Sequence, residues 1–83
     1  TRNWDFSRLA YMDVVIMQIA IAEMLNFPAI PVSVTINEYV ELAKLYSTPR
    51  SGGYINGMLD AIARNLVESG QLLKKVNPAK RAE

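Results

Sequence analysis

The sequence predicts an all-α fold, a compact helical bundle of about four helices, and three observations support this. Apolar residues recur at helical spacing over most of the chain. Breaks containing Pro28, Pro49 and Pro78 interrupt that spacing, and the residue before a proline is disfavoured in a helix. Hydrophobic residues make up 51% of the 83 residues, which is enough for one packed domain and too many for a disordered chain.

The first two helices are expected before the first proline break. A short helix from Trp4 to Tyr11 should end at a joint at Met12. The next helix, at about 13–26, should have Asp13 as its N-terminal cap. This helix is apolar on nearly every side, so it should be surrounded by other elements. Its many β-branched residues also suit a buried strand, but its length and its Ala-Glu-Met-Leu ending favour a helix.

The third helix is expected at about 33–47. Ser33 or Thr35 is its predicted cap, and Thr35 with Glu38 forms the pattern of a capping box. Its buried face should contain Ile36, Tyr39, Val40, Ala43 and Tyr46.

The fourth helix should begin at Thr48-Pro49, since proline suits the first helical position, and stop at Gly70. Its predicted buried stripe is Ile55, Met58, Leu59, Ile62 and Leu66, with an exposed charge ladder of Asp60, Arg64 and Glu68. Glycines in its first turns are unfavourable for a helix, which indicates a close approach of another group. Gly57 in particular should allow the third and fourth helices to pack closely.

Charge divides the chain into two parts. Residues 1–70 carry a net charge of −2 and form the predicted helical domain. Residues 71–83 carry +3, from Lys74, Lys75, Lys80 and Arg81 against Glu83, and should form a basic tail, either a short helical turn or disordered.

Composition argues against an enzyme. The chain has no cysteine and no histidine, so its serines have no base to activate them and no metal-ligand set exists. We therefore expect no catalytic residues, no metal and no cofactor. We expect no membrane span either, because the most apolar window, Val14 to Leu25, is shorter than the roughly 20 residues needed. A cytoplasmic location is expected.

Nucleic-acid binding has a candidate site at Arg50, Ser51 and Tyr54, with two glycines between the serine and the tyrosine. Amide groups at a helix N-terminus bind phosphate, and a tyrosine can stack on an unpaired base. The alternative is structural, in which the glycines complete a turn and Tyr54 covers the core.

Three segments resemble the C-terminal half of the NusB family of bacterial transcription antitermination factors. They are residues 18–24 (QIAIAEM), residues 34–44 (VTINEYVELAK) and residues 54–60 (YINGMLD), within a resemblance covering roughly residues 4–68. The resemblance implies an all-helical, non-catalytic factor that pairs with NusE, a small-subunit ribosomal protein, on boxA RNA of nascent transcripts, notably ribosomal RNA. It also implies association with the RNA polymerase elongation complex.

By the same resemblance Arg50, Ser51 and Tyr54 would face RNA, and Glu23 would face the protein partner. Four features depart from the family pattern. Arg50 stands where an acidic residue is common, Gly52 and Gly53 replace bulkier polar residues, and Tyr54 stands where phenylalanine is common. The fourth is the family's N-terminal half, with its arginine-rich first helix, which this chain lacks. The apolar surface of the 13–26 helix would then belong to that half, to another protein or to a homodimer.

Two alternatives to an antitermination factor remain. One is a NusB-like RNA-binding domain of a ribosomal RNA cytosine methyltransferase, although the basic tail favours a chain end over a following catalytic domain. The other is a helical protein-interaction adaptor with no RNA role.

Overall fold

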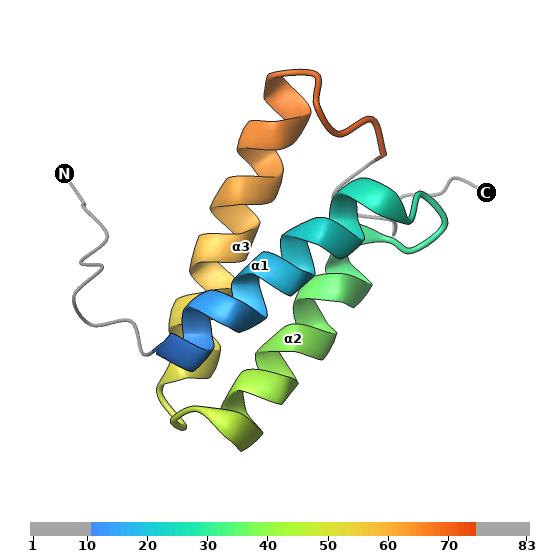
Figure 1. The fold of residues 1–83 in the computed structure, drawn as a ribbon. Helices are drawn as coiled ribbons and strands as arrows, with labels where there is room; N and C mark the ends of the chain where they lie inside the picture. Colours follow the sequence, from blue (N-terminus) through green and yellow to red (C-terminus); the bar gives the residue numbers. More distant parts are fainter. Residues whose placement is uncertain (1–10, 75–83) are drawn as a thin grey trace, which may run out of the picture.

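The computed structural model describes residues 11–74, which form three helices and contain no strand. The helices are α1 (Tyr11–Asn26), α2 (Val32–Tyr46) and α3 (Ser51–Glu68). Helices α2 and α3 run in opposite directions, and α1 lies across the pair (Figure 1). The all-α prediction is confirmed, with three helices where about four were expected. The predicted helix at Trp4 to Tyr11 lies almost entirely outside the described residues.

The core lies where the three helices meet. Each helix contributes one fully buried alanine, Ala20, Ala43 and Ala63, which allows close approach of the backbones. Larger side chains fill the remaining space: Ile16, Met17, Met24, Val32, Ile36, Ile55, Met58 and Leu59. The predicted stripe of α3 is confirmed, with Ile62 and Leu66 half-buried at its far end.

Helix α1 is covered on one side only, so the prediction that it is surrounded is wrong for the described residues. Large apolar side chains on its other side are exposed: Tyr11, Met12, Val14, Ile19 and Leu25. Helices α2 and α3 both lie against the same side of α1. They therefore cannot enclose a helix that is apolar on nearly every side. None of the three helices is long and apolar enough to cross a bilayer.

The helix starts differ from the predicted caps. Helix α2 begins at Val32, and the carbonyl of Pro31 accepts from the N–H groups of Val34 (3.1 Å) and Thr35 (3.2 Å). Thr35 is therefore inside the helix and fully buried, and the capping-box prediction is wrong. The backbone at Pro31 is extended (φ −61°, ψ 146°), and the helix begins directly after it. This early start places Val32 in the core.

Helix α3, in contrast, begins later than predicted. The segment before it forms a turn in which the Ser51 N–H donates to the Thr48 carbonyl at 2.9 Å, so the helix starts at Ser51 and Thr48 is not its cap. At its other end the prediction of a stop at Gly70 is confirmed. Gly70 has φ 82°, and Gln71 N–H donates back to Leu66 O at 2.9 Å, which is the Schellman arrangement.

The close approach predicted at the glycines in the first turns of α3 is found at Gly52, whereas the close helix packing predicted at Gly57 is not found. Gly57 is exposed, whereas Gly52 is buried under the Lys44 side chain of α2. The two glycines are five residues apart, which places them about 140° apart around a helix, so they cannot face the same neighbour. Tyr46, predicted to be buried, is 65% exposed because it is the last residue of α2.

A pair of adjacent glycines gives a matched test of this packing. A methyl group at Gly53 would meet nothing within 4 Å, so Gly53→Ala should stabilise the fold by about 0.5–1 kcal/mol through helix propensity. At Gly52 the added carbon would lie 2.8 Å from Lys44 Cε, so Gly52→Ala should gain less or lose stability. Urea unfolding of both variants measures this, and equal effects would contradict the packing described.

Candidate nucleic-acid interface

The loop between α2 and α3 brings the three predicted RNA-facing residues together. Arg50 precedes α3, Ser51 is its first residue, and Tyr54 lies within its first turn. All three line one open pocket of about 460 Å³, and Asp13 of α1 and Thr48 line it as well. That volume is within the range of small-ligand sites.

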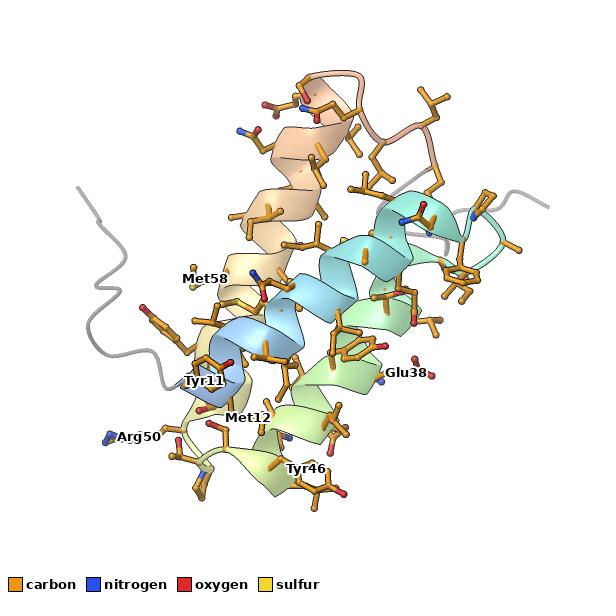
Figure 2. All side chains as sticks on the ribbon, viewed as in Figure 1. Tyr11, Met12, Glu38, Tyr46, Arg50 and Met58 are labelled. Carbon is orange, nitrogen blue, oxygen red and sulfur yellow. The ribbon has the colours of Figure 1, made fainter. Side chains whose placement is uncertain are left out.

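The lining residues lie at different depths. Arg50 is exposed, and its side chain extends away from the fold (Figure 2). Tyr54 is half-buried and packs against the core cluster, so part of its ring supports the fold and part remains accessible. Asp13 is only 2% exposed. The pocket therefore has a cationic rim, an aromatic side and an acidic base.

The Ser51 hydroxyl is held inside the fold. Its Oγ lies 3.0 Å from Asp13 Oδ2, 2.9 Å from Thr48 Oγ1 and 3.2 Å from Ser47 Oγ. A hydroxyl has one proton, and the carboxylate is the strongest of these acceptors, so we assign the donated bond to Asp13. The Ser51 N–H is also taken, by Thr48 O. Ser51 thus orders the pocket rather than presenting free donors to it.

Asp13 is a site residue that sequence analysis missed. It was expected to cap its own helix, but α1 begins at Tyr11 and Asp13 lies in the first turn with its carboxylate directed to Ser51. The two residues are 38 positions apart, so no local pattern signals the pair. A carboxylate beside the start of α3 already provides the negative charge that a helix N-terminus favours. Among the lining residues, Arg50 is the cation available to a phosphate.

Glu23 lies at the opposite end of α1, about 15 Å along the helix from Asp13. Its carboxylate accepts from Thr35 Oγ1 at 2.7 Å and from the Tyr39 hydroxyl at 3.1 Å, so it joins α1 to α2. Its side chain is half-buried. Glu23 is therefore separate from the pocket and forms part of a polar link between two helices.

The first part of the predicted basic tail returns to the bundle. Leu72 is buried in the core, and Lys74 Nζ donates to the carbonyls of Phe27 (2.8 Å) and Ile30 in the α1–α2 loop. Burial lowers the pKa of Lys74, and the nearby Glu23 partly opposes this. Lys75, Lys80 and Arg81 lie outside the described residues.

The Tyr39–Glu23 contact predicts a pH dependence. Burial raises the pKa of Tyr39 above 10.0, and the hydrogen bond to Glu23 raises it further. The folded state thus keeps this proton to higher pH than the unfolded state. Tyr39→Phe should cost about 1 kcal/mol at neutral pH. The wild-type advantage should be complete below pH 10.0 and should decline as pH rises through the raised pKa.

Urea unfolding of both proteins from pH 7 to 11 measures this difference. Lys74 titrates in both proteins, so its contribution largely cancels. A wild-type advantage that stays constant to pH 11 would contradict the role assigned to the Tyr39 proton.

Comparison with known proteins agrees with the family motifs. The NusB family model matches residues 1–64. The chain is 43% identical over 72 residues to the transcription antitermination protein NusB of Salinibacter ruber, covering 87% of this chain and 45% of that protein. It is 50% identical over 66 residues to the NusB protein of Natranaerobius thermophilus, covering 80% of this chain and 48% of that protein.

A third relative, NusB of Dictyoglomus turgidum, is 46% identical over 72 residues, covering 87% of this chain and 50% of that protein. The chain therefore spans about half the length of these relatives. No solved structure matches it significantly.

Proposed function

The chain belongs to the NusB family, and from this premise we propose that it binds RNA and protein in transcription antitermination. In this proposal it pairs with NusE on boxA RNA of nascent transcripts, notably ribosomal RNA, within the RNA polymerase elongation complex in the cytoplasm. Its relatives are named as transcription antitermination proteins, a non-catalytic family, which supports a binding role.

The observation that carries the RNA part of the proposal is the placement of Arg50 and Tyr54 on one pocket. Arg50 supplies an exposed cation for the RNA backbone, and phosphate contacts provide affinity with little sequence selectivity. Tyr54 supplies an aromatic face, and stacking is a common way to hold an unpaired base. Ser51 contributes by fixing the start of α3 against Asp13.

The protein-binding part is assigned to the other end of α1. Glu23 is held by Thr35 and Tyr39 yet remains partly accessible, so it can present its carboxylate to NusE in a fixed position. The exposed apolar side chains of α1 provide additional surface for a protein contact.

One experiment tests both parts with each variant as the control for the other. Tyr54→Ala should weaken boxA RNA binding by about 1–3 kcal/mol through lost stacking and should leave NusE capture unchanged. Glu23→Gln should weaken NusE capture and leave the RNA affinity unchanged. Fluorescence titration of labelled boxA RNA and a NusE pull-down measure the two effects, with circular dichroism to confirm folding.

A salt series adds a second criterion for the RNA contact. Arg50→Gln should reduce the slope of the logarithm of the binding constant against the logarithm of salt concentration by about one unit. If boxA RNA binds wild type, Tyr54→Ala and Arg50→Gln with equal affinity, the assignment of this pocket to RNA is wrong.

A further inference from the structure

One buried polar atom in the pocket has no partner. Asp13 Oδ2 accepts from Ser51, but Asp13 Oδ1 is the one buried side-chain polar atom within residues 11–74 that lacks a hydrogen-bond partner. A buried acceptor without a donor is unfavourable, and native proteins rarely leave one. The pocket beside it is therefore suited to a ligand that brings hydrogen-bond donors.

The arrangement of the lining residues restricts that ligand further. A phosphate cannot approach a carboxylate favourably, so a phosphate belongs at the exposed Arg50 and not at the buried Asp13. Half-buried Tyr54 lies on the same pocket and offers a flat apolar face. From the outside inward the pocket thus offers a cation, an aromatic ring and an acceptor, which is the order of phosphate, stacked base and base edge in a bound nucleotide.

We propose that this pocket selects a guanine base of the bound RNA, with Asp13 accepting from the guanine edge beside Tyr54. This inference rests on the RNA-binding function proposed above and specifies the base class at the same site. Guanine carries two adjacent donors, N1–H and the N2 amino group, and a carboxylate has two adjacent acceptor oxygens with lone pairs to match. Oδ1 has no donor, and Oδ2 retains a second lone pair beside the Ser51 bond. Both oxygens belong to a side chain that is only 2% exposed in the free protein, so in this proposal the base contacts them once the Asp13 side chain has turned into the pocket.

Other bases fit this acceptor pair less well. Adenine has one amino group beside the acceptor N1, and cytosine has one beside the acceptor N3, so each would place a ring acceptor against the second carboxylate oxygen. Uracil has a single N3–H donor flanked by two carbonyl oxygens. In each case one carboxylate oxygen would face another acceptor, which is repulsive.

The test uses boxA RNA in which each guanosine is replaced in turn by inosine, which lacks only the N2 amino group. One replacement should weaken binding to the wild-type protein about tenfold. Asp13→Asn keeps an oxygen for the Ser51 hydroxyl but places an amide N–H₂ where Oδ1 was. This variant should bind the guanosine and inosine RNAs with similar affinity.

One further variant serves as the control. Glu38→Gln makes the same chemical change on the exposed surface of α2, far from the pocket, and should keep the guanosine preference (Figure 2). If Asp13→Asn does not fold, the wild-type protein provides a second test. Replacing the sensitive guanosine by 2-aminopurine keeps the amino group but turns N1 into an acceptor, so binding should weaken, and unchanged binding would contradict the two-donor contact.

The outcomes separate this inference from the proposed function. Wild-type binding that is unaffected by inosine at every position, or a preference that survives Asp13→Asn, overturns the guanine assignment while RNA binding stands. Failure of the wild-type protein to bind boxA RNA at all overturns the proposed function and the guanine site with it.

Discussion

Leu59→Ala is expected to destabilise the protein by about 2–5 kcal/mol, because it removes three carbon atoms from a fully buried position and leaves a cavity. Leu59 is 0% exposed and lies in the cluster formed by all three helices. A domain this small has little stability in reserve, so a loss of this size should leave it largely unfolded near body temperature.

The matched control is Leu45→Ala on α2, where the same side chain is 75% exposed. That variant should change stability by less than about 0.5 kcal/mol. Urea unfolding followed by circular dichroism compares the two. Similar midpoints for both variants would show that the region around Leu59 is not the core.

Ala63→Leu is expected to destabilise the protein by about 1–3 kcal/mol for the opposite reason, since a larger side chain must enter a fully packed site. Ala63 is 0% exposed, and its small size permits the close contact between α3 and its neighbours. The added atoms can be accommodated only if a helix moves outward, which would disturb contacts along its whole length.

Ala61→Leu, two residues earlier on the same helix, is the control because Ala61 is exposed. Both substitutions have similar helix propensity, so any difference in melting temperature reports packing alone. If Ala63→Leu melts at or above the temperature of Ala61→Leu, the alanine contacts at the helix crossing are looser than described.

Local chemistry accounts for the parts of the fold that could be predicted from the sequence. Proline and glycine act on their own backbone, so the break before α2 and the stop at Gly70 were both predicted within a few residues. The helical periodicity of apolar residues identified the buried stripe of α3. The four-residue spacing of opposite charges identified the salt bridge between Asp60 and Arg64, in which Arg64 Nε lies 2.9 Å from Asp60 Oδ2. The joint presence of Arg50, Ser51 and Tyr54 on one pocket also follows from their proximity in sequence.

The helix caps show where local rules fail. Thr35 and Asp13 are both residue types that favour N-terminal caps, and both are buried inside helices with their side chains bonded to another helix. A cap contributes about 1 kcal/mol, which is less than the burial of a core side chain such as Val32. The helix start follows the core, and the polar side chain takes whatever partner the packing provides.

By itself the sequence determined that this protein is helical, roughly where each helix lies, which family it belongs to and which loop carries the candidate RNA residues, because all of these depend on neighbours along the chain. Only the tertiary structure decided that Asp13 lies beneath the pocket, that Glu23 links α1 to α2 and that Gly52 lies under the Lys44 side chain while Gly57 is exposed. These contacts join residues on different helices, and they depend on the angle and rotation at which the helices cross, which no local pattern specifies.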